Sequence, residues 1–69
     1  MADLPVAAID RLIRKAGAER VSEDAAEELS KILSEVAIDI SKQAIELAKH
    51  AKRKTITGED IKLATKTMQ

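Results

Sequence analysis

Sixty-nine residues with no cysteine, no aromatic side chain and one histidine exclude several classes of protein. Disulfides and thiolate metal sites are impossible, catalysis has few groups to draw on, and single-stranded bases have no platform for stacking. Twelve basic and twelve acidic residues give a net charge of zero, no apolar run approaches the roughly 20 residues that cross a bilayer, and no signal peptide opens the chain. We expect one soluble domain over residues 1–69 that is cytoplasmic, is not an enzyme and binds no cofactor or metal.

The first predicted helix covers about residues 5–16. Pro5 fits the first helical position, where its missing N–H is not needed, with Asp3 or Leu4 at the cap. Gly17 is expected to end the helix in the usual left-handed C-terminal position. One face of the helix is apolar and comprises Val6, Ile9, Ile13 and Ala16.

A long helix is predicted from Ser22 to about His50, and the chain is organised around it. Ser22 is a capping hydroxyl followed by two acidic residues in the first turn, and no glycine or proline appears before Gly58. At this length the helix spans on the order of 40 Å. The bulky apolar residues recur at steps of three and four and predict one buried stripe, which comprises Leu29, Ile32, Leu33, Val36, Ile40, Ala44, Leu47 and Ala51.

The long helix also has a second apolar side. Ile38 and Ile45 are one heptad apart and fall nearly opposite the stripe on a helical wheel. The arc between them and the stripe carries small residues, namely Ser30, Ser34, Ala37, Ser41 and Ala48. A helix that is apolar on more than one side should be buried on more than one side, and the flanking segments are too short to cover it. The sequence therefore predicts a partner chain.

The last predicted helix covers about residues 58–67. Thr57, with Asp60 three places later, is a candidate capping box, and Ile61, Ala64 and Met68 share one face. The segment before this helix, residues 55–60, echoes residues 20–24 before the long helix. Both contain a β-branched residue, a hydroxyl cap and two acids, so the chain reads as two overlapping helix–strand–helix units.

Positive charge is concentrated beyond the ends of the long helix. Residues 1–22 carry a net charge of +1, residues 23–48 carry −5, residues 49–57 carry +4 and residues 58–69 carry none. Without further information, the run at residues 52–54 would be a solvated turn, since charged runs usually are.

Two stretches resemble the archaeal histones, a family of minimal histone-fold proteins. They are DLPVAAIDRLIRKAGAERVSEDA near the start and ELAKHAKRKTITGEDIKLA near the end, and the resemblance covers essentially the whole chain without gaps. It implies an all-α histone fold of short, long and short helices, with two chains clasped antiparallel in an intertwined homodimer. The link before the long helix of one chain would then lie beside the second link of the other, and the two links could pair as short strands.

The resemblance also implies double-stranded DNA as the partner, bent around the protein by contacts to its backbone. Arg20 resembles an arginine inserted into the minor groove, and Lys54 and Thr55 match a pair that contacts phosphates. The remaining cations of the predicted DNA surface are Arg11, Arg14, Lys52 and Arg53. Where the family commonly has glycine, this chain has Lys52.

Three further roles are carried over from the family. Leu47, His50 and Asp60 match the patch through which dimers join into tetramers or longer polymers. Arg53 and Asp60 match a structural clamp between the second link and the last helix, and Gly17 sits where adjacent turns of a protein–DNA superhelix stack. From the residues alone, His50 reads as solvated and Arg53 with Asp60 as an ordinary surface ion pair.

We therefore expect an architectural chromatin protein that compacts the chromosome in the nucleoid. The alternative is a histone-fold subunit that pairs with a paralogous histone or another foreign chain in a regulatory complex and binds DNA weakly or not at all. The zero net charge and the acidic long helix favour this alternative.

Overall fold

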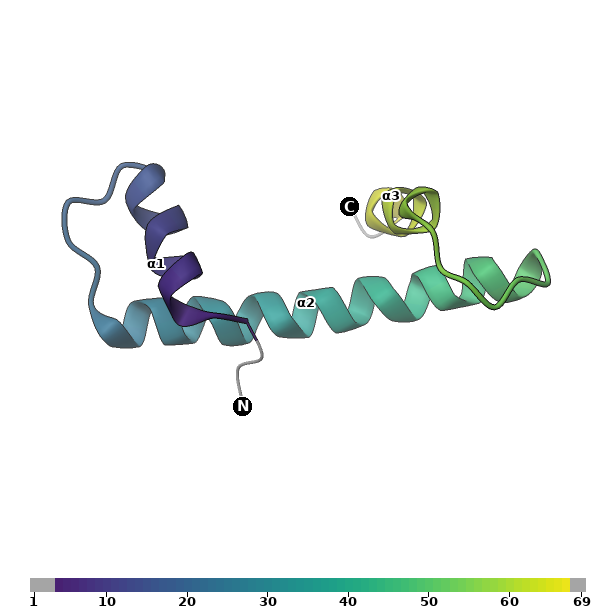
Figure 1. Cartoon of the computed structure of the whole chain (residues 1–69), viewed down its shortest axis with the longest axis horizontal. Coiled ribbons are helices and arrows are strands. Elements are labelled where there is room, and N and C mark those ends of the chain that lie inside the picture. Colours follow the sequence, from purple (N-terminus) through teal and green to yellow (C-terminus); the bar gives the residue numbers. More distant parts are fainter. Residues whose placement is uncertain (1–3, 68–69) are drawn as a thin grey trace. The chain divides into compact units, whose positions relative to one another are not determined.

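A computed structural model describes residues 4–67 of the chain, and within that range every regular element is a helix. The elements are α1 (Val6–Lys15), α2 (Glu23–His50) and α3 (Gly58–Thr67), as Figure 1 shows. The prediction of an all-α chain with short, long and short helices is confirmed. The predicted positions of Asp3 and Met68 lie outside the described residues. None of the helices described has the length and apolar character needed to cross a membrane.

The chain divides into two compact units, one up to Glu35 and the other from Val36 onward, and α2 contributes to both. The links between helices have no strand structure among residues 4–67. Their expected pairing needs a second chain and stays a prediction.

In the N-terminal unit, both ends of α1 are fixed locally. Pro5 is the N-cap in place of the predicted Asp3 or Leu4, so the helix begins at Val6, one residue later than predicted. The Pro5 carbonyl accepts the first helical hydrogen bond from the Ile9 N–H at 3.2 Å. At the other end, Gly17 has φ +120°, its N–H donates to the Arg14 carbonyl at 3.0 Å, and the Ala18 N–H donates to the Ile13 carbonyl at 3.4 Å. These bonds form a Schellman motif, which confirms Gly17 as the left-handed stop.

The core of the N-terminal unit is built on small residues of α2. Ile9 of α1 is buried, and so are Ala26 and Ser30 on α2. The Ser30 hydroxyl donates to the Leu4 carbonyl at 2.9 Å and so ties the entry of α1 to α2. One turn later, the Ser34 hydroxyl donates to the Ser30 carbonyl at 2.9 Å, which satisfies a second buried hydroxyl.

The C-terminal unit repeats this arrangement. α2 ends in a second Schellman motif, in which the Lys52 N–H donates to the Lys49 carbonyl and the Arg53 N–H donates to the Ala48 carbonyl, both at 2.9 Å. Ala44 and Ala48 of α2 are buried together with Ala64 of α3. As in the N-terminal unit, the short helix packs where α2 has small side chains.

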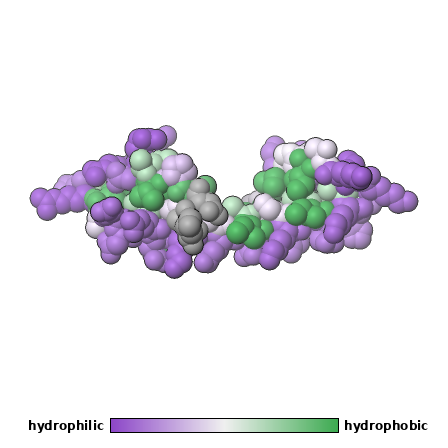
Figure 2. Space-filling model, turned by 60° about the horizontal axis from the view of Figure 1, so that its bottom comes forward, coloured by the Kyte–Doolittle hydropathy of each residue, from purple (hydrophilic) through white to green (hydrophobic). Residues whose placement is uncertain are grey.

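The bulky apolar residues of α2 are less covered than the stripe predicts. Ile32 is 46% exposed and Val36 is 42% exposed, although both belong to the predicted stripe, and Ala51 is exposed as well. Ile38 and Ile45, on the second apolar side, are also exposed. The short helices cover small residues at two places on α2, Ser30 and Ser34 in one unit and Ala44 and Ala48 in the other, whereas Ala37 between them is exposed. Small residues allow close backbone approach, and the larger side chains remain beside them. Green apolar surface is visible in both units in Figure 2.

Candidate functional site

The predicted cations gather most densely in the link between α2 and α3. Lys52, Arg53 and Lys54 follow one another at the surface, and Thr55 beside them is exposed too. The Schellman motif fixes the start of this link, and Thr57 fixes its end by capping α3. The Thr57 hydroxyl accepts from the Asp60 N–H at 3.3 Å, and the Asp60 carboxylate accepts from the Thr57 N–H at 2.9 Å. This pair is the predicted capping box, with aspartate in the place of the more usual glutamate.

Arg53 is bound to Asp60 by two parallel hydrogen bonds. Arg53 Nη2 donates to Asp60 Oδ1 at 2.8 Å, and Arg53 Nη1 donates to Asp60 Oδ2 at 3.0 Å. Arg53 Nη1 also donates to the Thr55 carbonyl at 3.0 Å, so the guanidinium binds both the link itself and the first turn of α3. Such fork-to-fork pairs fix geometry as well as charge.

The same contacts set the ionisation of Asp60. Asp60 is only 4% exposed, and its carboxylate accepts four hydrogen bonds, two from Arg53 and two from Thr57. The hydrogen bonds from the Arg53 guanidinium, followed by that from the Thr57 N–H, hold the pKa of Asp60 far below its usual value. In return, the bond to Asp60 raises the pKa of Arg53. Both groups therefore stay charged across the physiological range.

Arg53 is thus committed mainly to its own chain. Three of its five N–H donors are used, and its side chain is 40% exposed. The side chains of Lys52 and Lys54, on either side of it, are exposed and have no hydrogen bond or ion pair within residues 4–67. The link therefore presents two unpaired lysines around a fixed arginine.

The cations predicted at the first link are more dispersed. Arg20 is exposed in the link before α2, and Arg11 is exposed on α1. Neither makes an ion pair with any residue that the structure describes. Arg14 Nε donates to Asp10 Oδ2 at 3.2 Å, which neutralises part of its charge. The structure therefore distinguishes Arg11 and Arg20 from Arg14.

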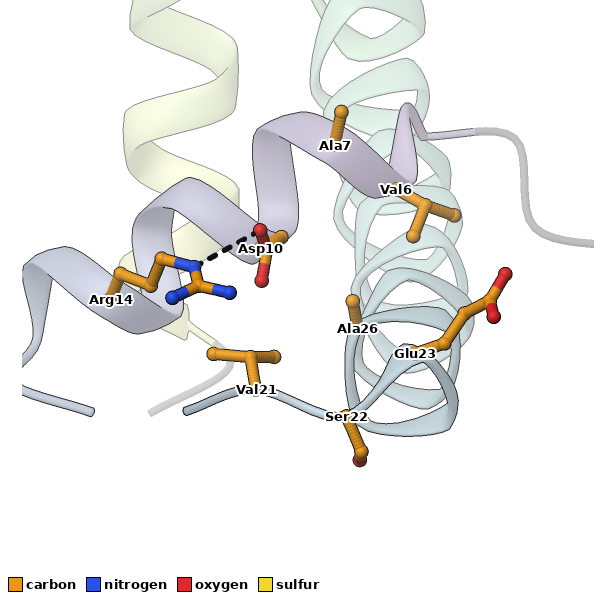
Figure 3. Close-up of a pocket in the computed structure, with 8 residues that line it drawn as sticks. All are labelled: Val6, Ala7, Asp10, Arg14, Val21, Ser22, Glu23 and Ala26. Carbon is orange, nitrogen blue, oxygen red and sulfur yellow. Dashed lines mark hydrogen bonds and ion pairs between the residues drawn. The ribbon is translucent and has the colours of Figure 1, made fainter. Parts of the chain in front are cut away.

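An open pocket of about 330 Å³ lies between α1 and the start of α2, in the N-terminal unit. Figure 3 shows the Arg14–Asp10 pair on its α1 side, with Glu23 on the α2 side. Because two carboxylates accompany one guanidinium, this pocket does not favour a phosphate. Its lining comprises Val6, Ala7, Asp10, Arg14, Val21, Ser22, Glu23 and Ala26.

The residues predicted to join dimers differ in their accessibility. His50 is exposed as the last residue of α2, Leu47 is half-buried, and Asp60 is buried under its hydrogen bonds. Asp60 Oδ1 accepts a single bond within the described chain, so it retains capacity for one more donor. Residues 4–67 contain no group of three or more side chains suited to hold a metal ion.

Two features of the site are not apparent from the sequence. Thr57 is recognisable there only as a helix cap, yet it also helps to fix the charge of Asp60. Lys52 in place of glycine suggests a stiffer link, but its backbone lies at φ +57°, a left-handed conformation that a lysine does not by itself indicate. The available signal for this conformation is the equivalent position of Gly17 in the first link. Gly17 and Lys52 each lie two positions after the last residue of a helix.

The sequence is similar to known proteins over nearly its whole length. Residues 2–65 match the model of a family described as histone-like transcription factor (CBF/NF-Y) and archaeal histone. The chain is 64% identical over 66 residues to a protein from Thermococcus zilligii that is named as one subunit of archaeal histone HAN1, covering 96% of this chain and 98% of that protein. It is 52% identical over 64 residues to a protein named probable archaeal histone 3 of Methanocaldococcus jannaschii, covering 93% and 96% of the two chains.

Proposed function

The chain belongs to the family of histone-like transcription factors (CBF/NF-Y) and archaeal histones, and from this we propose that it is an architectural chromatin protein that binds double-stranded DNA. Such a role requires no catalytic group. It needs cations and backbone N–H groups that face phosphates, because histone-type binding relies on the DNA backbone and its deformability. The exposed basic link between α2 and α3 is the observation that carries the proposal.

Within this proposal, the residues have separate roles. Arg20 enters the minor groove, while Lys54 and Thr55 contact phosphates beside it. Arg53 acts mainly through the structural clamp with Asp60, which holds the link in place. Arg11 supplies a cation from α1, and Arg14 contributes less because Asp10 accepts its hydrogen bond.

The proposed unit is an antiparallel homodimer. Each unit of the chain leaves isoleucine side chains exposed on α2, including Ile32 in the first and Ile38 in the second. A second copy of the chain would cover them and gain about 25 cal/mol for every Å² of apolar surface removed from water. It would also bring Arg20 of one chain beside Lys54 of its partner, so that cations of both chains share one surface.

Dimers are further proposed to join end to end and wrap DNA. In this arrangement His50, which is exposed at the end of α2, donates a hydrogen bond, and the half-buried Leu47 supplies apolar surface on the same helix. Asp60 Oδ1 is the matching acceptor on a neighbouring dimer, and Gly17 allows adjacent turns to stack. The number of dimers sets the length of DNA that is protected.

A salt titration of duplex binding tests the proposed function. We expect log Kd to rise linearly with log salt between about 50 and 200 mM, with a slope of about 0.9 per phosphate contacted. Affinity should differ little between duplexes of unrelated sequence but should be higher for easily bent ones. Absence of duplex binding at low salt, or binding that salt does not weaken, would falsify the proposal.

A second candidate is a member of a heteromeric histone-fold complex. Two observations favour it, namely the acidic body of α2 and the word subunit in the name of the relative from Thermococcus zilligii. Mass measurement of the purified chain without DNA separates the two candidates. A stable homodimer at micromolar concentration supports the first, and a monomer that dimerises only with a different histone-fold chain supports the second.

A further inference from the structure

The pocket between α1 and the start of α2 combines an apolar lining with an excess of negative charge. Val6 of α1, Val21 of the first link and Ala26 of α2 line it, as Figure 3 shows. The two carboxylates and one guanidinium described above complete the lining. With a volume of about 330 Å³, the pocket is large enough for a branched apolar side chain, and its charge favours one that arrives beside a cation.

Ile56, in the link between α2 and α3, has the matching features. It is 39% exposed, and among residues 4–67 it is the one leucine, isoleucine or valine that is exposed outside a helix. The backbone is fixed on both sides of it. The Thr55 carbonyl accepts from Arg53 Nη1 at 3.0 Å, and the Thr57 N–H donates to the Asp60 carboxylate at 2.9 Å. Because its position is already determined, burying this side chain against another chain costs little conformational entropy.

The backbone and the charge of the two links point to the same contact. Neither Val21 nor Ile56 has a backbone hydrogen bond within the part of the chain that the structure describes. Backbone N–H and C=O groups are strong hydrogen-bonding groups, so both links retain capacity for pairing with another chain. In addition, the exposed Lys54 lies two residues before Ile56 and supplies a cation of the sign that the pocket favours.

The further inference rests on the proposed homodimer. We propose that the pocket receives Ile56 of a second copy of the chain, and that this fit helps to decide which chain becomes the partner. The 28 residues of α2, a helix on the order of 40 Å long, lie between the first link and the second in each chain, so the occupant comes from the other copy. A two-fold dimer makes the contact twice, because each chain fills the pocket of the other.

Two variants change the side chain and the pocket separately. Ile56→Ala shortens the side chain, and Val6→Phe enlarges a residue that lines the pocket. Each homodimer should unfold at lower urea than the natural one at the same protein concentration. In the first the pockets stay empty, and in the second they are overfilled. Val6→Leu is measured alongside as the smaller enlargement.

Mixing the two variants separates this fit from a general loss of stability. Ile56→Ala and Val6→Phe are unfolded together in urea and refolded without DNA, and the dimers are counted by native mass spectrometry. In a mixed dimer the enlarged pocket lining faces the shortened side chain, and the unaltered pocket receives an unaltered Ile56. The ratio of mixed dimers to homodimers should therefore rise several-fold above the statistical value, at which about half of all dimers are mixed. A double variant with both changes in one chain should unfold at higher urea than Val6→Phe alone.

Leu63→Ala mixed with Val6→Phe is the matched control. Leu63 is 44% exposed, close to the value for Ile56, but it lies on α3, and this mixture should stay statistical. A statistical proportion of mixed dimers in both mixtures, or an equal excess in both, would overturn the inference and leave the proposed homodimer intact. If the natural chain is a monomer in solution, the proposed homodimer fails together with the inference.

Discussion

Arg53 and Asp60 lie seven residues apart and are joined by two hydrogen bonds of 2.8 and 3.0 Å. The pair connects the middle of the basic link to the first turn of α3. Thr57 adds its N–H and hydroxyl to the same carboxylate, at 2.9 and 3.1 Å. The conformation of the link is therefore determined inside one chain, before any partner chain or DNA is present.

Replacing Asp60 with asparagine should destabilise the chain and loosen the link. Asparagine is almost the same size as aspartate, but it carries no charge for Arg53 and has one acceptor oxygen in place of two. We expect a lower urea midpoint and a weaker affinity for duplex DNA, because the cations lose their fixed positions. Arg53→Lys is the companion variant, since lysine keeps the charge without the planar fork. An Asp60→Asn protein as stable as the natural chain would contradict the clamp.

The stability of the chain should fall in acid because of the same pair. The pKa of Asp60 in the folded protein lies below its unfolded value of about 3.9, since the charged form is the one that Arg53 and Thr57 bind. The stabilisation is complete above the unfolded pKa and is lost as the pH falls through the folded pKa. Urea midpoints measured between about pH 7 and pH 2 should fall below about pH 4. The decline should be smaller in Asp60→Asn than in the natural chain.

The two glycines should respond to alanine in opposite directions. Gly17→Ala should cost about 1–2 kcal/mol because φ is +120° there, and no neighbouring atom lies within 4 Å of the added Cβ, so the loss is backbone strain alone. Gly58 lies in the first turn of α3 with equally open space, and Gly58→Ala should stabilise the chain by up to about 1 kcal/mol. Chemical unfolding of both variants checks the prediction. Changes in the free energy of unfolding that have the same sign in both variants would refute it.

Thr57→Ala should cost about 1–2 kcal/mol of stability, since it removes the N-cap of α3 and one bond to Asp60. Thr57→Ser keeps the hydroxyl and should be close to neutral. Ser22→Ala removes the cap of α2, where the Ser22 hydroxyl accepts from the Ala25 N–H at 3.3 Å. It should cost less than Thr57→Ala because no carboxylate completes a capping box there. Urea unfolding ranks the three variants. A larger loss of stability in Ser22→Ala than in Thr57→Ala would count against the capping box of Thr57 and Asp60.

A charge on the second apolar side of α2 should break the proposed homodimer. Ile38 is 51% exposed in the single chain, and Ile38→Glu places a carboxylate where a second copy would cover it. We expect sedimentation at micromolar concentration to show a monomer or an unfolded chain. Lys42→Glu changes the charge more but lies on the charged face of the helix, and it should leave the dimer intact. Dimers of equal stability in both variants would place the interface elsewhere.

A bulky acid at His50 tests how dimers join. His50→Glu should leave the homodimer intact but repel Asp60 of the neighbouring dimer, so that shorter lengths of DNA survive nuclease digestion. His50→Gln, which has no charge but can still donate a hydrogen bond, is the control. Footprints of unchanged length in His50→Glu would exclude this residue from the junction.

Helix positions in this protein were predictable because their signals are local. Ser22 and Thr57 cap the helices that follow them, and Gly17 stops the first helix, all within one turn of the residue concerned. The basic link could be found for the same reason, since Lys52, Arg53 and Lys54 are adjacent. The capping box of Thr57 with Asp60 was also correct, because its two members are only three residues apart.

Packing could not be read from the sequence in the same way. Helical spacing shows that α2 has two apolar sides, but it does not say which side a short helix will cover. The structure covers Ala26 and Ser30 in one unit and Ala48 in the other, and it leaves Ile32 exposed. This choice depends on how closely two backbones can approach, which small residues permit and isoleucine does not. Likewise, the left-handed backbone of Lys52 follows from the hydrogen bonds that close α2, and an isolated lysine gives no sign of it.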